Sequence, residues 1–554
     1  MKKTLIPIIS VLLVLLFAAC AESTGGEPQE GSRDVKLSVI CGGETVLPYE
    51  DESGKIFFLP SFASDALLSV EGEAVINGET VKGGGYADML SDCSSFTLGV
   101  GDDAEEVRVM RSENLPAVFI KTDGGLDSVN ASEDHSVYVS GSLSVIDESG
   151  KCLYSGELKK IRGRGNATWD GEKKPYQIEL SSSASLLGLA KAKKYVLLAN
   201  FYDPSLLRNT AALSIAENCG AAATPGFAAV DLYADGEYLG SYLLCEKAGI
   251  GSGRIEISEL EKITEKLLSA PPESYLRGGE TVGAEPGSDK WYNLPENPSD
   301  ITGGYLLEVE YTERYPDEAS GFVTKRGLPV VVKSPEYASR EQTEYIKNYF
   351  EEFEDALFSE DGYNSEEKHY SDYADVDSLI FRYLLEEFTL NIDGGISSFY
   401  IYKDTDASDG RLNFSCAWDY DCSLGNYALY ADLTSPEALF SASSETRNAG
   451  SMPNIFFALT SHEEIKAKIC KYYAETFRPA VCATLTELYS EIERIAASAE
   501  MDYARYPDTS RFDKYKADAG RDFESAAEYL TDFVSRRISF FDSTFGMADK
   551  NEAE

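Results

Sequence analysis

The stretch Ile161–Leu180 reads IRGRGNATWDGEKKPYQIEL, and it predicts a β-hairpin that carries several positive charges. Arg162 and Arg164 are separated by a single glycine, so in an extended backbone both side chains point to the same face. Gly165 and Asn166 suit a tight turn between the two strands. This hairpin is the centre from which we interpret the rest of the chain.

The positive charge of this hairpin contrasts with the composition of the whole chain. Lys173 and Lys174 add to the two arginines, whereas the 554 residues include 94 Asp or Glu against 50 Lys or Arg, a net charge of −44. An anionic ligand held between two strands is one explanation for such a cluster. The other is that the arginines pair with the abundant carboxylates of the protein itself. Charge alone leaves both open.

The N-terminus has the features of a bacterial lipoprotein signal peptide. Lys2 and Lys3 precede a short uncharged apolar run, which ends in Phe-Ala-Ala-Cys at Cys20 and resembles a lipobox. We therefore predict a signal peptide over residues 1–20, lipidation of Cys20 and a flexible polar tether over residues 21–33. The product would be anchored to the outer face of the cytoplasmic membrane. An ordinary secreted protein with Cys20 near the cleavage site is the alternative.

Length and composition exclude several classes of function. A chain of 554 residues exceeds one ordinary core, so two or more domains are expected. The acidic net charge argues against nucleic-acid binding and would attract a basic macromolecule.

Cys41 with Cys93, and Cys470 with Cys482, could pair, but neither pair has metal-ligand spacing. The three histidines lie beside no nucleophile signature, and no GxxxxGK[ST] motif occurs, which disfavours a catalytic triad and excludes a P-loop.

Hydrophobic patterning divides the chain into a β-rich start, a mixed middle and a helical end. Residues 34–111 alternate short apolar runs with glycine-rich turns, which predicts a small β-sandwich module. A larger unit over residues 115–545 begins with strands, two of which are joined by a turn at Asp235-Gly236. Beyond Glu341 the chain is mostly helical. This order predicts an α+β, two-lobed fold.

Two aspartates flank a second predicted hairpin. A helix that starts at Val376 stops just before Asp393, a strand follows, and the return strand over residues 411–417 leads to Asp419. Paired strands lie about 5 Å apart, so both carboxylates are expected at one site. One can accept the proton of a substrate hydroxyl while the other holds a divalent cation, as in phosphoryl transfer. The alternative is that Asp393 caps a turn and Asp419 is a solvated strand end.

Several segments around these residues resemble the spore coat protein H (CotH) kinase family. They occur in the family's order over residues 115–545 and read IRGRGNATW, KKPYQIEL, LLANFYDPSLLRN, DLYADGEYLGSYLLCEK, GGYLLEVE, NID and AWDYDCSLGN. The resemblance implies an atypical protein-kinase-like fold. It also implies transfer of phosphate from ATP to serine or threonine of a protein substrate, with Mg²⁺ or Mn²⁺ as the metal.

The resemblance further implies roles for individual residues. Asp393 would be the catalytic aspartate and Asp419 the metal ligand, with Asp421 and Asn426 supporting the metal site. Ser398 stands where kinase-type sites often have an asparagine that binds a second metal, and its hydroxyl is a poorer ligand, which weakens the case for two metals. The residues implied in nucleotide binding are Arg162, Arg164, Lys174, Glu246 and Lys247. Asp203, Arg208 and Asn209 match family landmarks whose role could be structural.

The leading hypothesis is a surface-anchored, CotH-like protein kinase that acts on a basic, serine-rich protein partner. The alternative is a non-catalytic binding or adhesion protein of the same fold, whose N-terminal module holds an extracellular ligand. Intact Asp393 and Asp419 favour the enzyme, whereas Ser398 and a location that rarely meets cytosolic ATP favour the binding protein. A carbohydrate hydrolase could also use paired carboxylates, but it leaves the arginine-rich hairpin unexplained and ranks last.

Overall fold

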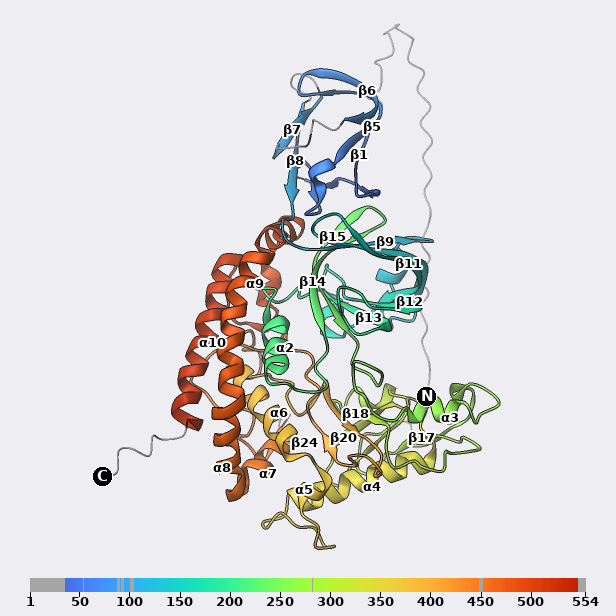
Figure 1. The fold of residues 1–554 in the computed structure, drawn as a ribbon, viewed down its shortest axis with the longest axis vertical. Coiled ribbons are helices and arrows are strands. Elements are labelled where there is room, and N and C mark those ends of the chain that lie inside the picture. Colours follow the sequence, from blue (N-terminus) through green and yellow to red (C-terminus); the bar gives the residue numbers. More distant parts are fainter. Residues whose placement is uncertain are drawn as a thin grey trace, which may run out of the picture.

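The structure is a computed structural model, shown in Figure 1. It describes residues 35–52, 54–86, 90, 94–99, 104–280, 282–447 and 452–546. The predicted signal peptide, the lipidation site Cys20, the tether and Cys93 lie outside the described residues. Cys470 and Cys482, whose pairing the sequence left open, are free thiols.

The described N-terminal strands belong to one hydrogen-bonded sheet of eight strands. They are β1 (Lys36–Cys41), β2 (Glu44–Val46), β3 (Tyr49–Asp51), β4 (Gly54–Leu59), β5 (Leu67–Ile76), β6 (Glu79–Tyr86), β7 (Ser95–Leu98) and β8 (Glu105–Arg111). Their order is β2-β1-β5-β7-β8-β4-β3, with β6 paired to β5. Alternate residues of β1 are buried, as a strand with one face on a core requires. The β-rich character predicted here is confirmed, and the sandwich arrangement stays a prediction.

The next seven strands close into a barrel that contains the arginine-rich hairpin. They are β9 (Ala117–Thr122), β10 (Tyr138–Ile146), β11 (Cys152–Gly163), β12 (Tyr176–Ala184), β13 (Ala192–Leu198), β14 (Phe227–Ala234) and β15 (Glu237–Glu246), in the order β10-β11-β12-β13-β15-β14-β9. The predicted hairpin is formed by β11 and β12, which pair antiparallel. The tight turn predicted at Gly165 and Asn166 is wrong, because a longer connection over residues 164–175, with a 3-10 helix at Ala167–Asp170, joins the two strands. Asp235 and Gly236 join β14 to β15 with φ values of 51° and 91°, as a tight two-residue hairpin turn needs.

A second sheet of seven strands lies below the barrel in Figure 1. It is made of β16 (Arg277–Gly279), β17 (Lys290–Tyr292), β18 (Tyr305–Val309), β19 (Gly321–Val323), β20 (Pro329–Ser334), β21 (Phe399–Lys403) and β22 (Leu412–Asn413), in the order β16-β17-β19-β20-β18-β21-β22. The short strands β23 (Thr446–Arg447) and β24 (Met452–Pro453) pair separately. The hairpin predicted between Asp393 and Asp419 is β21–β22, but its return strand is shorter than expected because only Leu412 and Asn413 pair with β21.

Helices cover one flank of the barrel and the second sheet. The α-helices are α1 (Asp127–Asn130), α2 (Arg208–Asn218), α3 (Leu260–Glu265), α4 (Arg340–Leu357), α5 (Tyr370–Tyr373), α6 (Val376–Thr389), α7 (Ile455–Ser461), α8 (Glu463–Tyr472), α9 (Arg478–Arg505) and α10 (Phe523–Phe545). A π-helical turn over Tyr473–Phe477 joins α8 to α9. In Figure 1 α8, α9 and α10 run along the same side of the molecule.

Helix α6 is the buried centre of the helical part and leads directly into the candidate site. The Asp375 side chain accepts a hydrogen bond from the backbone N–H of Ser378 and so caps its N-terminus. Nearly every residue of α6 is buried, as expected for a helix that is enclosed on all sides. It ends at Thr389 and is followed by Leu390, whose left-handed conformation (φ 50°) turns the chain toward Asp393.

The N-terminal sheet packs on the barrel and on α9 through a shared hydrophobic cluster. Phe58 of the sheet, Phe119 and Tyr233 of the barrel and Met501 of α9 belong to it. Tyr233 donates a hydrogen bond to the Phe58 carbonyl over 3.2 Å, and its ring stacks on Phe119 with centroids 4.6 Å apart. This apolar contact fixes the orientation of the sheet on the barrel.

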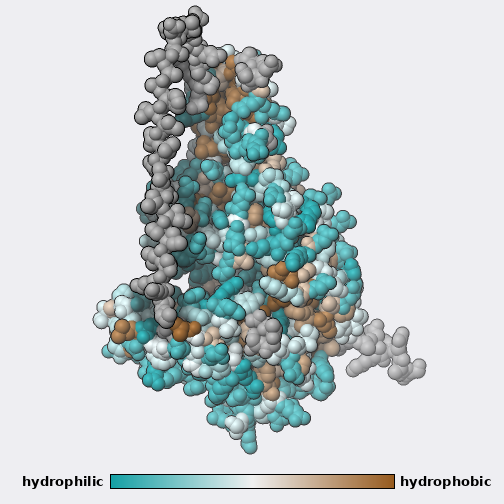
Figure 2. Space-filling model, turned by 180° about the vertical axis from the view of Figure 1, so that it is seen from behind, coloured by the Kyte–Doolittle hydropathy of each residue, from teal (hydrophilic) through white to brown (hydrophobic). Residues whose placement is uncertain are grey.

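The observed content of helices and sheets confirms the predicted α+β class, while the kinase-like two-lobed arrangement stays a prediction. Within the described ranges, no helix has both the length and the hydropathy that crossing a bilayer requires. The face of the molecule seen in Figure 2 is largely hydrophilic, in keeping with the abundance of charged residues.

Candidate functional site

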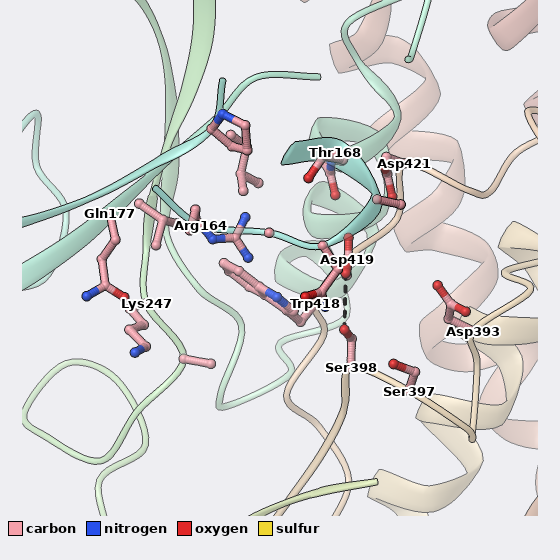
Figure 3. Close-up of a pocket in the computed structure, with 18 of the residues that line it drawn as sticks. Arg164, Thr168, Gln177, Lys247, Asp393, Ser397, Ser398, Trp418, Asp419 and Asp421 are labelled. Atoms are coloured by element: carbon pink, nitrogen blue, oxygen red, sulfur yellow. Dashed lines mark hydrogen bonds between the residues drawn. The ribbon is translucent and has the colours of Figure 1, made fainter. Parts of the chain in front are cut away.

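A cavity of about 390 Å³ lies between the barrel and the second sheet, within the usual range for ligand pockets. Arg162 and Arg164 line it from the barrel side. Asp393, Asp419 and Asp421 line it from the segments around β21 and β22. The cavity therefore contains guanidinium groups and carboxylates, and Figure 3 shows Arg164 with the three aspartates.

The two arginines of the hairpin are available to a ligand. Both line the cavity, as predicted from their alternation in an extended strand. The guanidinium carbon of Arg164 lies 5.6 Å from the centroid of the Trp418 ring. Neither arginine forms an ion pair with any residue that the structure describes, although the chain has many carboxylates. This favours the anionic ligand over internal pairing as the reason for the arginines.

The two lysines of the hairpin have structural partners instead. Lys173 is fully buried, and its ammonium donates hydrogen bonds to the Asp502 carboxylate of α9 and the Ser241 carbonyl. The Lys174 ammonium donates to the carbonyl of Trp169 over 2.7 Å. Neither lysine lines the cavity. The implied place of Lys174 beside a nucleotide is thus not what the structure shows.

Two further residues implied by the resemblance also lie off the cavity lining. Glu246 accepts a hydrogen bond from the backbone N–H of Gly226 over 3.1 Å, so it braces the barrel. Its neighbour Lys247, directly after the end of β15, does line the cavity. Asn426 is buried, and its side-chain amide donates to the carbonyl of Asp421 over 2.9 Å, which fixes the backbone beneath that carboxylate.

The structure brings Asp393 and Asp419 to the same site, as the flanked hairpin predicted. Asn391 links them: its side chain donates to the Asp419 carbonyl over 3.3 Å and accepts from the Asp393 backbone N–H over 3.2 Å. Ser398 donates to a carboxylate oxygen of Asp419 over 3.1 Å. Asp419 itself has a left-handed backbone (φ 68°), which is costly outside glycine and typical of functional sites.

The carboxylates of this site repel one another. The pKa of Asp393 is raised to about 6, chiefly by burial and in addition by the nearby Asp419 carboxylate, against the opposing effect of a hydrogen bond from Tyr311. The pKa of Asp421 lies well above its usual range, first because of burial and then because of Asp419 and Asp393. A cation or a proton at this end of the cavity would relieve the repulsion.

The donors present fit a divalent cation in kind. Among the described residues, no group of three or more His, Cys, Asp or Glu side chains is arranged to hold a metal ion. Mg²⁺, however, commonly uses one or two carboxylates and completes its shell with water and substrate phosphates. Asp419 and Asp421 supply two such carboxylates in a cavity that also contains arginines for the phosphates.

The family landmarks Asp203, Arg208 and Asn209 hold the segment after Asp419 in place. Arg208 is fully buried, pairs with Asp203, and donates through Nε to the Ser423 carbonyl over 3.1 Å. Asn209 accepts from the backbone N–H of Tyr420 over 2.8 Å. Asp203 and Arg208 thus support the segment after Asp419, and Asn209 does so while also lining the cavity.

Replacing Arg208 with methionine is expected to lower the free energy of unfolding by about 3 kcal/mol, because Asp203 is left as an unpaired buried charge. Chemical denaturation monitored by circular dichroism measures this effect. Arg536→Met is the matched control, since its ion pair with Glu437 is half-exposed. Equal unfolding midpoints for the two variants would contradict the assignment.

The residues of the site that sequence reasoning missed include His135, Thr168, Gln177 and Tyr311. The first three line the cavity. Thr168 and Gln177 lie within the arginine-rich hairpin. Strand alternation could therefore have placed Gln177 on the face that lines the cavity. The Nε2 atom of His135 is buried without a hydrogen-bond partner among the described residues, and its pKa is lowered by burial and by the arginines. No local pattern indicated His135 or Tyr311.

The site as described has the charge distribution of a pocket for a phosphate-bearing ligand and a divalent cation. A family model described as CotH kinase protein matches residues 161–541, which is more than half of the chain and includes every cavity residue discussed above except His135. The chain belongs to the CotH kinase family. No curated protein matches it.

Proposed function

We propose that this protein is a protein kinase that transfers the γ-phosphate of ATP to serine or threonine of a protein substrate. The observation that carries the proposal is that Arg162 and Arg164, which have no ion pair among the described residues, line the same cavity as Asp393 and Asp419. Membership of the CotH kinase family supports the same activity. A metal-dependent phosphoryl transfer needs both halves of such a site, cations for phosphate and carboxylates for metal and proton.

In the proposed reaction Asp393 accepts the proton of the substrate hydroxyl. The hydroxyl oxygen then bonds to the γ-phosphorus as the bond to the β,γ-bridging oxygen breaks, and ADP leaves. Arg162 and Arg164 bind the phosphate oxygens and offset their charge. Mg²⁺ or Mn²⁺, held by Asp419 and Asp421, would supply additional neutralisation of the phosphates when bound.

The partner and the location belong to the same proposal. The net charge of −44 supports a basic protein substrate, for which we propose a serine-rich segment. The basic, apolar and small residues that precede Cys20 support lipidation there and attachment to the outer face of the cytoplasmic membrane. Attraction between an acidic kinase and a basic substrate would weaken with added salt.

Label transfer from γ-labelled ATP tests the proposal. The full-length chain, solubilised in mild detergent, is incubated with Mg²⁺ or Mn²⁺, alone and with a basic serine-rich peptide. Label on serine or threonine, dependent on the metal, is the expected result. If nucleotide does not bind and no label appears, the chain is a binding or adhesion protein on this fold instead.

Transfer is expected to rise with pH through about 6, because only the ionised Asp393 carboxylate can accept a proton. The Tyr311 hydroxyl donates to that carboxylate and favours its ionised form. Tyr311→Phe should therefore move the acid limb of the pH–rate profile to higher pH. Tyr427→Phe is the control. Tyr427 lies close enough to Asp393 for an electrostatic interaction, but its hydroxyl forms no hydrogen bond with that carboxylate among the described contacts. An acid limb that stays in place in Tyr311→Phe would contradict the role of Tyr311.

A further inference from the structure

The outer strand of the second sheet, β16 (Arg277–Gly279), has exposed apolar side chains beside both of its ends. Leu276, directly before β16, is 80% exposed, and Val282, three residues after it, is 79% exposed. They are the two most exposed large aliphatic side chains among the described residues. Ile263 and Leu267 of α3, earlier in the same stretch of chain, are exposed as well. Apolar side chains that gather at a surface in this way mark an interaction site.

Strand β16 also has a free edge. One side of it pairs antiparallel with β17, where Arg277 is opposite Tyr292 and Gly279 is opposite Lys290. No described strand pairs with its other side. A free edge presents N–H and C=O groups to which another strand can pair, and proteins usually protect such edges with charged side chains, proline or a covering segment. The sequence Arg-Gly-Gly protects β16 little, because two of its three residues have no side chain.

The surroundings of this edge are negatively charged. Residues 259–300 contain nine Asp or Glu against four Lys or Arg. Glu273, Glu280 and Glu285 are exposed, and none of them forms an ion pair with a described residue. The Glu280 carboxylate accepts a hydrogen bond from the backbone N–H of Val282 over 3.1 Å, which places a negative charge beside the exposed valine. Such a surface repels anionic lipid and attracts a positively charged protein segment.

The edge is separate from the ligand cavity but is connected to the cavity wall. Leu276, Arg277 and Val282 do not line the cavity. The Arg277 guanidinium, however, donates a hydrogen bond to the carbonyl of Glu318, a residue that does line it. In Figure 1 α3 and β17 lie at the lower right of the molecule, and in Figure 2 hydrophobic side chains are visible at the lower left, which is the corresponding side after the turn.

We infer that the free edge of β16 is a docking site for an extended, basic segment of a partner protein. A strand added to this edge gains main-chain hydrogen bonds, and its alternate side chains reach the groups beside the edge. Apolar side chains of the segment cover Leu276 and Val282, and its lysines or arginines meet Glu273, Glu280 and Glu285. Docking here does not depend on phosphate transfer, so it adds to the function proposed above.

Fluorescence anisotropy of a labelled peptide, with the full-length chain in mild detergent, tests the docking site. The probe is a peptide of about ten residues, the upper length of an ordinary strand, in which lysine and valine alternate. One control peptide has serine in place of valine, and the other is the lysine–valine peptide N-methylated at every residue, which removes its backbone donors. The lysine–valine peptide is expected to bind about tenfold more tightly than either control.

Variants of the protein locate the binding. Leu276→Ser and Val282→Ser should each weaken binding of the lysine–valine peptide about tenfold, because each removes an apolar side chain that the bound strand covers. Both side chains are exposed, so the unfolding midpoints of the variants should match that of wild type. Leu153→Ser is the matched control, since Leu153 is an exposed leucine on the barrel strand β11. Its affinity for the peptide should equal that of wild type.

Several results would overturn the docking site. Equal binding of the lysine–serine peptide would reduce the interaction to charge, and equal binding of the N-methylated peptide would exclude strand addition. Unchanged affinity in both Leu276→Ser and Val282→Ser would place the peptide elsewhere. Sedimentation in the same detergent is expected to show a monomer. If wild type instead self-associates and Leu276→Ser is monomeric, a second copy of the chain covers the edge and the basic partner segment is ruled out.

Discussion

Replacing Asp393 with asparagine is expected to lower phosphate transfer by about a thousandfold, within the range that a general base contributes. Asparagine has nearly the same shape as aspartate but cannot take the proton of a substrate hydroxyl. The Tyr311 hydroxyl can still donate to the amide oxygen, so the local geometry is retained. Nucleotide and metal binding should stay measurable, because Arg162, Arg164 and Asp419 are unchanged.

The experiment compares initial rates of label transfer with nucleotide binding in the same preparations. Asp432→Asn is the matched control, because Asp432 accepts hydrogen bonds from Thr434 in an exposed turn away from the cavity. Its transfer rate should equal that of wild type. Loss of both transfer and nucleotide binding in Asp393→Asn would mean that Asp393 belongs to the ligand-binding part of the site and not to proton transfer.

The parts of the site that could be predicted are the side chains whose positions follow from the local sequence pattern. Arg162 and Arg164 were placed on one face by strand alternation, and Asp393 and Asp419 were brought together because they flank one hairpin. Both inferences need only a strand and a turn. Helix α6 could be predicted as well, because the spacing of its apolar residues and its end before Asp393 both follow from consecutive residues of the sequence.

Contacts between residues that are distant in sequence could not be predicted. Lys173 pairs with Asp502, which lies 329 residues further along the chain on α9. No residue near Lys173 in the sequence indicates that partner. Local sequence therefore does not distinguish a lysine in a buried ion pair from a lysine that binds a ligand. The position of Lys247 could not be predicted either: this residue directly follows β15 and lines the cavity, whereas Glu246 does not.

The conformation of Asp419 depends on a set of long-range contacts in the same way. Its backbone is left-handed, and residues from α2 and from the segment before β21 hold it there through Asn209 and Asn391. The sequence marks Asp419 as a candidate ligand through its position after the hairpin. The orientation of its carboxylate comes from contacts that only the folded chain provides.

Replacing Asp419 with asparagine should remove the dependence of nucleotide binding on Mg²⁺ and lower transfer by a hundredfold to a thousandfold, the scale of losing one electrostatic stabiliser. The amide can still accept the hydrogen bond of Ser398, so the change is one of charge. The same substitution removes one of the carboxylates that raise the pKa of Asp421.

Titrating Mg²⁺ at fixed ATP, with bound nucleotide as the readout, measures the effect of Asp419→Asn directly. Ser398→Ala is the control, because it removes the hydrogen bond to Asp419 but leaves the negative charge that a cation needs. Its metal titration should stay close to that of wild type. A titration of Asp419→Asn that overlays wild type would remove Asp419 as a metal ligand. Asp421 would then be the remaining carboxylate proposed to hold the metal, and its own substitution by asparagine would decide that assignment.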